Sequence, residues 1–372
     1  MSGGGLDLHR LVPPHVMAFE PDSVAPPDAV LAGRYGVPGL IRLHNNENPL
    51  GPPEAARAVL ASVGAGHSIP YPSGDAWIVR RAVADFLAID ADMVVAGNGA
   101  NEVIGAVLKT FCAQGDNLVT ADQTFAVAEW VGRAAGVDVR LVPLRDHTFD
   151  DAGLLARVDA RTKLVVICNP NNPTGTWWTH DRLDDFLRRL AGRAIAVVDE
   201  AYQEFVDEPG FPDTRALLAR HPNLIVFRTF SKAWGLAGLR LGYLIASPEI
   251  VALVRRVMIS YSVNAVAQAA GAAALSEPQH LERTRAMVRD ADRFLRRELA
   301  RLELPVIGRS GNFLLVRLPM PDTTAHRHLA RRGFLVRTMS PFRFPNHIRV
   351  TFSTLPIMER FIGALEEVVR VR

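Results

Sequence analysis

The stretch KLVVICNPNNPTG, residues 163–175, is the part of the sequence from which the fold is best inferred. Its first six residues are mainly apolar and β-branched, which predicts a short strand that is buried on both faces. The run then ends in a segment with three asparagines and two prolines. The prolines fix the backbone there, so the asparagine amides are presented at the end of the strand. This arrangement indicates a ligand site at the carboxyl edge of a parallel sheet.

Similar runs alternate with helix-like segments on both sides of this stretch, at residues 93–96, 117–121, 137–142, 194–199 and 223–228. The alternation predicts an α/β domain whose mostly parallel sheet is covered by helices on both faces. From residue 278 the pattern changes to a long polar helix over 278–302, strands at 313–318, 334–339 and 347–352, and helices at 323–332 and up to about residue 369. We therefore expect an extended arm and part of a small domain over residues 1–45, a large domain over 46–275, and a small α+β domain over 276–372.

Composition excludes several classes of protein. Hydrophobic residues make up 48% and charged residues 22% of the 372 residues, which is typical of a globular protein. The net charge of +3 is spread along the chain, so no nucleic-acid partner is expected. Cys112 and Cys168 are too few for a disulfide framework or a zinc site, which favours a cytoplasmic protein without a metal. The first five residues lead into no apolar signal core, and the longest apolar stretch, 265–275, is shorter than a membrane span.

Two further strand ends carry polar residues that suit an anion and a cationic ring. The run 93–96 leads into small residues and then Ala100 and Asn101 at the start of a helix, where backbone N–H groups can bind a phosphate. The run 194–199 ends in Asp199, and a carboxylate at the end of a buried strand needs a partner. A protonated heterocyclic nitrogen is one partner that would satisfy it.

The last of these strand ends brings an amine beside hydroxyl and guanidinium groups. The run 223–228 is followed by Thr229, Ser231 and Lys232, and Arg240 comes eight residues after the lysine. A single lysine of this kind is more often an exposed surface residue. Four polar strand ends in this order favour a shared site instead.

These motifs resemble the signature of the fold-type-I pyridoxal-phosphate aminotransferases, and the histidinol-phosphate aminotransferase branch is the most similar. The segments that carry the resemblance are residues 169–175, 199–202 and 231–240, supported by 43–53 (LHNNENPLGPP), 97–102, 264–269 and 312–317 (NFLLVR). The resemblance extends from about residue 35 to near the carboxyl terminus. It implies a large domain with a mostly parallel seven-stranded sheet, a smaller carboxyl-terminal domain, and a homodimer with a shared active site.

The resemblance also implies a role for each matching residue toward the cofactor. Lys232 would hold pyridoxal 5'-phosphate as a Schiff base and then move the substrate's α-proton. Asp199 would pair with the ring nitrogen and so control the electron demand of the ring. Asn172 and Tyr202 would donate to the phenolic oxygen, and Phe125 would stack on the ring. The phosphate would be bound by Ala100, Asn101, Thr229, Ser231 and Arg240, and by Tyr71 of the neighbouring subunit.

On the substrate side, Arg349 matches the residue that binds the α-carboxylate, a task that suits a planar guanidinium. Arg337 matches the residue that contacts a distal phosphate, and Tyr35 and Asn48 match other substrate contacts. The sequence departs from the family at His44, Asn45, Pro70, Ser353 and in the bulky segment 340–345 that contains Phe342.

Because several of these departures lie where the substrate is recognised, the amino donor stays open. We expect histidinol phosphate or an aromatic amino acid as donor and an oxo acid such as 2-oxoglutarate as acceptor. The alternatives are an amino-acid decarboxylase or an oxygen-dependent oxidase on the same fold, and a cofactor-binding regulator.

Overall fold

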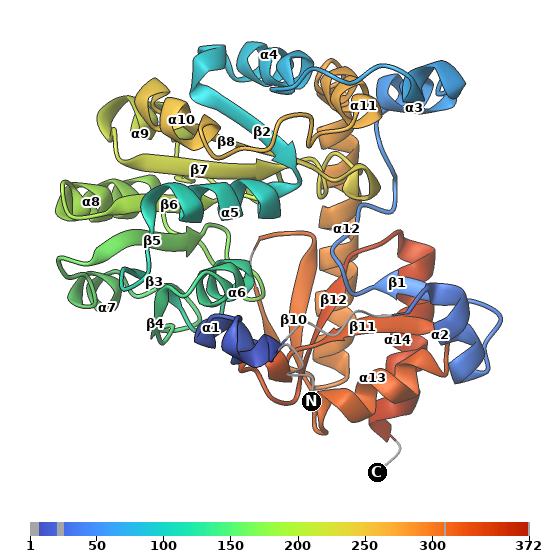
Figure 1. Ribbon diagram of the computed structural model, residues 1–372. Coiled ribbons are helices and arrows are strands. Elements are labelled where there is room, and N and C mark those ends of the chain that lie inside the picture. Colours follow the sequence, from blue (N-terminus) through green and yellow to red (C-terminus); the bar gives the residue numbers. More distant parts are fainter. Residues whose placement is uncertain (1–6, 21–25, 309, 371–372) are drawn as a thin grey trace, which may run out of the picture.

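The computed structural model describes residues 7–20, 26–308 and 310–370. Figure 1 shows a larger part built on a seven-stranded sheet and a smaller part built on a five-stranded sheet. The predictions for residues 1–5 lie outside the described residues. Within the described ranges, no helix combines the length and the apolar character that crossing a membrane requires.

The large sheet has the strand order β2-β8-β7-β6-β5-β3-β4. All neighbouring pairs are parallel except those that involve β8, which runs antiparallel to both β2 and β7. The α/β class with a mostly parallel sheet is therefore confirmed. The strands are β2 (Val94–Asn98), β3 (Asn117–Ala121), β4 (Asp138–Val142), β5 (Thr162–Cys168), β6 (Ile195–Asp199), β7 (Leu224–Thr229) and β8 (Leu241–Ala246).

Helices cover both faces of this sheet because successive residues of each buried strand point to opposite sides. In β5, Val166 packs into a core with α5 (Ala100–Phe111), α6 (Val127–Ala134) and α10 (Pro248–Arg255), whereas Ile167 packs into the core on the other face. The helices of that second face are α4 (Trp77–Leu87), α7 (Asp151–Ala156), α8 (His180–Leu190), α9 (Thr214–Arg220) and α11 (Ala265–Leu275), and α3 (Glu54–Ala61) packs against α11.

The small sheet has the strand order β1-β11-β12-β10-β9. Its strands are β1 (Ile41–Leu43), β9 (Val306–Ile307), β10 (Phe313–Arg317), β11 (Phe334–Thr338) and β12 (His347–Thr351). The helices of this part are α2 (Asp28–Tyr35), α13 (Asp322–Ala330) and α14 (Leu355–Arg370), and a short helix α1 (Pro14–Met17) lies near α6. Leu43 of β1 is paired in parallel with Val336 of β11, so the amino-terminal segment joins the carboxyl-terminal sheet.

One long helix, α12 (Gln279–Arg301), runs between the two parts (Figure 1). Near its start, the Thr284 hydroxyl accepts a hydrogen bond from Asn48 at 3.0 Å. At its other end, Arg301 forms an ion pair with Glu366 of α14 at 2.9 Å. The helix therefore contacts the segment before α3 at one end and the small part at the other.

The sequence pattern did not predict β8. Its six residues follow directly after Arg240 and are all buried. A short apolar run in this position does not reveal whether it forms a strand, a helix or a buried loop. Pairing with β2 and β7 decides the outcome, because it satisfies the buried backbone groups on both edges of β8.

Candidate active site

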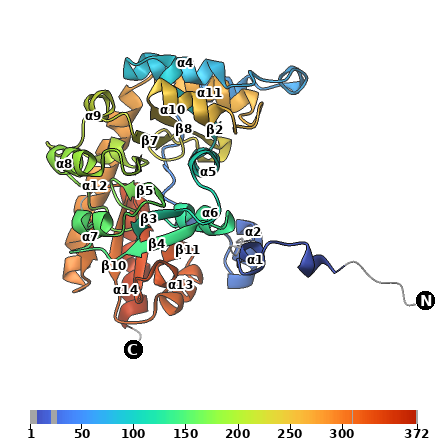
Figure 2. The ribbon, with the colours of Figure 1, turned by 60° about the vertical axis from the view of Figure 1, so that its left-hand side comes forward.

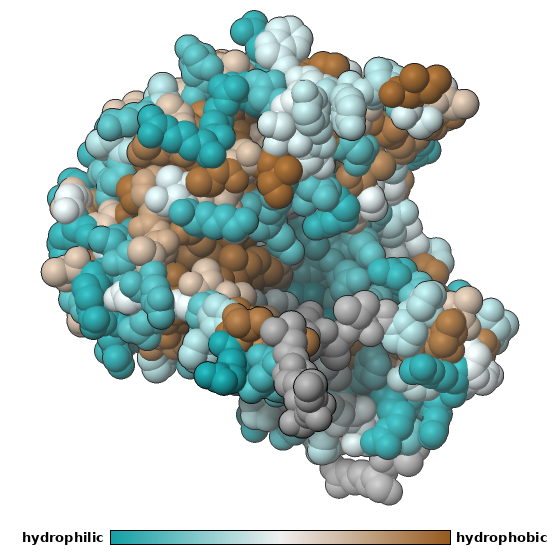
Figure 3. Space-filling model, in the orientation of Figure 1, coloured by the Kyte–Doolittle hydropathy of each residue, from teal (hydrophilic) through white to brown (hydrophobic). Residues whose placement is uncertain are grey.

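The cavity that contains the predicted site lies beyond the carboxyl ends of β5, β6 and β7 and has a volume of about 470 Å³. Figure 3 shows a deep and largely hydrophilic hollow between the two parts of the molecule. The predicted residues that line the cavity are Ala100, Asn101, Phe125, Asn172, Asp199, Tyr202, Thr229, Ser231, Lys232, Arg240, Arg337 and Arg349.

Lys232 supplies the amine of the cavity. Its Nζ donates a hydrogen bond to the backbone carbonyl of Asn45 at 2.7 Å and lies 5.9 Å from the ring of Tyr202. Burial, and then the positive charge of Arg349, lower the pKa of Lys232 to about 7. A large fraction of this amine is therefore neutral, and so nucleophilic, near neutral pH.

Asp199 ends β6 and places a carboxylate in the same cavity. One oxygen accepts a hydrogen bond from the backbone N–H of Ala201 at 3.0 Å, and the other lies 3.9 Å from the sulfur of Cys168. Burial raises the pKa of Asp199 to about 6, which means that its charged form has few stabilising partners. A cationic ring nitrogen would supply the partner that the protein does not.

Tyr202 is held by two asparagines. Its hydroxyl accepts hydrogen bonds from Asn46 Nδ2 at 2.9 Å and from Asn172 Nδ2 at 3.4 Å. Burial raises the pKa of Tyr202 to about 12, so the phenol stays protonated and can donate to an oxygen in the cavity. Asn172 and Tyr202 therefore offer adjacent polar groups to the cavity.

An anion cradle forms where α5 begins. Gly99 precedes the helix with φ +80°, and no side chain caps the first backbone N–H groups of α5. A Cβ on Gly99 would lie 2.6 Å from Arg240 Nη2, and the guanidinium also donates to the Ser231 hydroxyl at 3.4 Å. Free helix N–H groups, a hydroxyl and a guanidinium together suit a phosphate monoester.

Two arginines face the cavity from the small part. Arg337 and Arg349 are cross-strand neighbours in β11 and β12. Arg349 donates to Asn172 Oδ1 at 2.5 Å and to the His44 carbonyl at 2.6 Å, whereas its buried Nε has no partner among the described residues. Burial lowers the pKa of Arg349 to about 10. A substrate carboxylate would satisfy both the charge and the unused donor.

Three predicted residues do not line this cavity. Asn48 is buried, and its amide donates to the Ala233 carbonyl at 2.9 Å and to Thr284. The ring of Tyr35 packs edge-on against His326 with centroids 6.4 Å apart. Tyr71 is 83% exposed. Because the Asn48 amide is already bonded to Ala233 and Thr284, it is not available to a substrate in this conformation.

The positions that depart from the family lie in different surroundings. Phe342 and Asn45 line the cavity, whereas Pro70 is exposed. His44 and Ser353 do not line it, and the buried Nδ1 of His44 has no partner among the described residues. Burial lowers the pKa of His44 to about 4, so the ring is neutral at physiological pH.

Sequence reasoning missed Asn46 and Trp130. Asn46 is fully buried with φ +56°, and its backbone N–H and side chain both bond to the Thr351 hydroxyl while its amide holds Tyr202. Asparagine tolerates this left-handed conformation better than most residues, and this was the one feature of the sequence that could have indicated a special role for Asn46. Trp130 lines the cavity from α6, and nothing in the sequence pattern distinguishes it from a core aromatic.

Lys232, the buried carboxylate of Asp199 and the anion cradle at the start of α5 lie in one cavity. A fold-type-I pyridoxal-phosphate site requires this combination. The donor set therefore fits this cofactor. A model of the family described as aminotransferase class I and II matches residues 38–365. The chain belongs to this family and is a pyridoxal-phosphate-dependent transferase, as the sequence motifs predicted.

The chain is similar to several members of this family over most of its length. The chain is 38% identical to a histidinol-phosphate aminotransferase of Anaeromyxobacter sp. (strain Fw109-5), over 96% of this chain and 99% of that protein. It is 39% identical to the histidinol-phosphate aminotransferase of Symbiobacterium thermophilum, over 89% and 91% of the two chains. The structure of histidinol-phosphate aminotransferase from Sinorhizobium meliloti in complex with pyridoxal-5'-phosphate superposes with a TM-score of 0.86 at 25% identity, covering 96% and 97% of the two chains.

Proposed function

We propose that this aminotransferase takes the amino group from histidinol phosphate, or from an aromatic amino acid, and passes it to an oxo acid such as 2-oxoglutarate. The observation that carries the proposal is the pair Arg337 and Arg349. Both guanidiniums line the cavity, and their contacts within the described residues are with an amide oxygen, a backbone carbonyl and aromatic rings, not with a carboxylate. The aromatic rings of Trp130 and Phe342 line the same cavity. A donor with an anionic end and a flat apolar middle suits this combination.

The cavity residues that match the family motifs would share the contacts with the cofactor. When bound, pyridoxal phosphate supplies an electrophilic aldehyde carbon and an electron-withdrawing ring. Asp199 would hold the ring nitrogen protonated, and Asn172 and Tyr202 would donate to the ring oxygen. The phosphate would be bound by the N–H groups of Ala100 and Asn101 together with Thr229, Ser231 and Arg240. Phe125, which lines the cavity, would stack on the ring face.

Lys232 and Arg349 act on the substrate. The amine of Lys232, neutral above a pH of about 7, accepts a proton from the substrate's α-carbon and returns it elsewhere on the reacting group. Arg349 binds the α-carboxylate and so fixes the orientation of the α-carbon toward that amine. Arg337 binds a distal anion of the donor. Tyr35 and Asn48 stay proposed substrate contacts only for a conformation in which the two parts lie closer together.

The experiment uses the scarcity of lysine in this chain, which has three: Lys109, Lys163 and Lys232. The purified protein with pyridoxal phosphate should show a visible absorbance band that bleaches with a suitable donor and returns with 2-oxoglutarate. Borohydride reduction should fix the cofactor on Lys232. The variant Lys232→Ala should lose both results, whereas Lys109→Arg and Lys163→Arg should keep them.

The outcomes separate the proposed reaction from its alternatives. If neither histidinol phosphate nor any aromatic amino acid bleaches the absorbance band, the proposed donor is wrong. Release of carbon dioxide or consumption of oxygen without an oxo acid would contradict amino transfer. Arg337→Ala should raise KM for histidinol phosphate by about tenfold or more, because a charge-assisted contact is lost. An unchanged KM would remove Arg337 from the proposal.

We further propose that the enzyme is a homodimer in which Tyr71 reaches the cofactor phosphate of the partner. Tyr71 and Ile69 are 83% and 82% exposed in a segment that projects from the body between α3 and α4 (Figure 2). The Tyr71 ring contacts that of Tyr261, whose own side chain is half exposed. Exposed apolar side chains that cluster in this way are typical of a protein interface.

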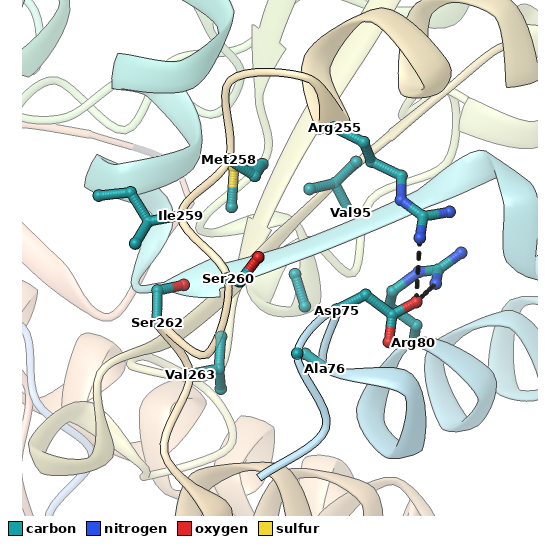
Figure 4. A pocket seen from close by; sticks show the side chains of 12 residues that line it. Asp75, Ala76, Arg80, Val95, Arg255, Met258, Ile259, Ser260, Ser262 and Val263 are labelled. Atoms are coloured by element: carbon teal, nitrogen blue, oxygen red, sulfur yellow. Dashed lines mark hydrogen bonds and ion pairs between the residues drawn. The ribbon is translucent and has the colours of Figure 1, made fainter. Parts of the chain in front are cut away.

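The base of this projecting segment is held in place by charges. Asp75 accepts hydrogen bonds from Arg80 and Arg255 at 2.5 and 3.1 Å, and Figure 4 shows these bonds at one side of a small pocket that Met258 and Val263 also line. A fixed base supports a role of the segment in binding a partner. Mixing Tyr71→Ala with Lys232→Ala protomers should restore activity, because one of the two sites in each mixed dimer is intact. Activity that stays absent after mixing would contradict a shared site.

The division of the chain and its location complete the proposal. We propose boundaries at residues 45/46 and 275/276, supported by the pairing of β1 with β11 and by the start of α12 at Gln279. We also propose a cytoplasmic location, supported by the free thiols of Cys112 and Cys168. Limited proteolysis and the thiol content of the protein isolated from cells would test the two proposals.

A further inference from the structure

The turn between β11 and β12 contains an arginine in an unusual backbone conformation. A short 3₁₀ helix (Ser340–Phe342) ends at Arg343, which has φ +61° and ψ +27°. This left-handed conformation is adopted without cost only by glycine. The presence of Arg343 there indicates that its side chain makes contacts that offset the cost.

The turn is fixed firmly to the small part of the molecule. The carboxylate of Asp322, in the first turn of α13, accepts hydrogen bonds from the N–H groups of Met339 and Ser340 at 2.8 Å each. It also accepts one from the Ser340 hydroxyl at 2.5 Å. The turn therefore moves with α13.

The same turn is bound to the large part through Arg343. Its guanidinium donates to the Asp122 carbonyl at 2.5 Å and to the Glu129 carboxylate at 3.2 Å. In return, the side chain of Gln123 donates to the Arg343 carbonyl at 2.7 Å. Glu129 belongs to α6, which lies at the boundary between the two parts in both ribbon views (Figures 1 and 2).

These contacts join two segments that both line the cavity, one from each part of the molecule. Phe342, next to Arg343, lines the cavity and lies 5.4 Å below the guanidinium of Arg337. Phe125 and Trp130, on either side of Glu129 in the sequence, line it from the large part. The side chain of Glu129 is 14% exposed and that of Arg343 is 44% exposed, so solvent screens their ion pair from one side only.

We propose that Arg343 is a positioning residue that sets the width of the subsite for the donor's side chain, and thereby the preference between bulky and small amino donors. Arg343 does not touch the substrate in this arrangement. It acts by holding the wall that carries Phe342 and Arg337 at a fixed separation from the wall that carries Trp130. The inference rests on the proposed aminotransferase function, because donor preference is its readout.

The experiment compares Arg343→Met with a matched control in the holoenzyme. Arg133 also donates to Glu129, at 3.1 Å, but it lies on α6 itself and does not reach the small part. Arg133→Met therefore removes an ion pair from the same carboxylate without separating the walls. Arg343→Met should change the ratio of kcat/KM for an aromatic donor to that for alanine by roughly threefold or more. Arg133→Met should leave this ratio unchanged.

A variant of Glu129 and amide hydrogen exchange test the same contact independently. Glu129→Gln should shift the ratio in the same direction as Arg343→Met. The double variant should add little to the effect of Arg343→Met, because the ion pair with Glu129 is already lost in that variant. Amide hydrogen exchange should accelerate in both 122–130 and 339–345 in Arg343→Met but not in Arg133→Met. An unchanged donor ratio in Arg343→Met, or an equal change in Arg133→Met, would overturn the inference. A wild-type protein that transfers no amino group would instead contradict the proposed function. Hydrogen exchange would in that case still test whether Arg343 holds the two segments together.

Discussion

Replacing Lys232 by methionine is expected to stabilise the cofactor-free protein, and to do so more at pH 6.5 than at pH 9. Burial is the main reason that the pKa of Lys232 falls from its ordinary value of 10.5 to about 7. The unfolded chain binds a proton more tightly, so the cost to folding is fully present below pH 7 and is lost as the pH rises to 10.5. At roughly 1.4 kcal/mol per pKa unit, that cost is about 5 kcal/mol at pH 6.5 and about 2 kcal/mol at pH 9.

Urea unfolding of the cofactor-free wild type and Lys232→Met at the two pH values checks this prediction. The gain in unfolding free energy should be about 2–3 kcal/mol larger at pH 6.5. The lost hydrogen bond to Asn45 costs about 1 kcal/mol at either pH and cancels in the comparison. Lys163→Met is the control, because that side chain is 41% exposed. An equal gain at both pH values, or a larger one at pH 9, would refute the assignment of Lys232 as a buried neutral amine.

Three further predictions concern the ring partner, the phosphate cradle and the core. Asp199→Asn should lower kcat by about 100-fold or more in a coupled transamination assay, because the ring nitrogen loses its charged partner. Gly99→Ala should weaken pyridoxal-phosphate binding by about tenfold in a titration of the cofactor-free protein, whereas Gly115→Ala, with φ +93° and open space around its Cβ, should not. Arg228→Leu should lower the unfolding free energy by about 3–5 kcal/mol in urea, because the buried Glu200 carboxylate at 2.8 Å loses its partner. Replacing both partners with leucine should cost less than this single change.

The sequence predicted the elements whose signals are local. The strands of the large sheet other than β8 were expected within about two residues of their observed bounds, because β-branched runs bounded by polar turns are readable without tertiary context. The pairing of β1 with β11 and the antiparallel direction of β8 depend on contacts between residues that are far apart in sequence. Such contacts leave no periodic trace in either strand.

The site shows the same division between local and distant information. Asp199, Lys232 and Arg240 lie at strand ends or close after them, so their convergence follows from the geometry of a parallel sheet. The orientation of Asn48 toward α12, and of Asn46 toward Tyr202, is set by partners more than 150 residues away. The family motif assigned Asn48 to the substrate and gave Asn46 no role, whereas neither residue lines the cavity and Asn46 contacts it only through Tyr202.

A small tilt of helix α12 at one end produces a larger displacement at its other end. Its 23 residues form a stiff rod about 34 Å long, attached near one end to Asn48 and at the other to Glu366 of the small part. A rod of this length acts as a lever: a tilt of about 5° at the end near Asn48 moves the far end by about 3 Å. Such a displacement equals the length of a hydrogen bond. A small movement of the segment that carries Asn48 can therefore alter polar contacts in the small part, such as the ion pair between Arg301 and Glu366.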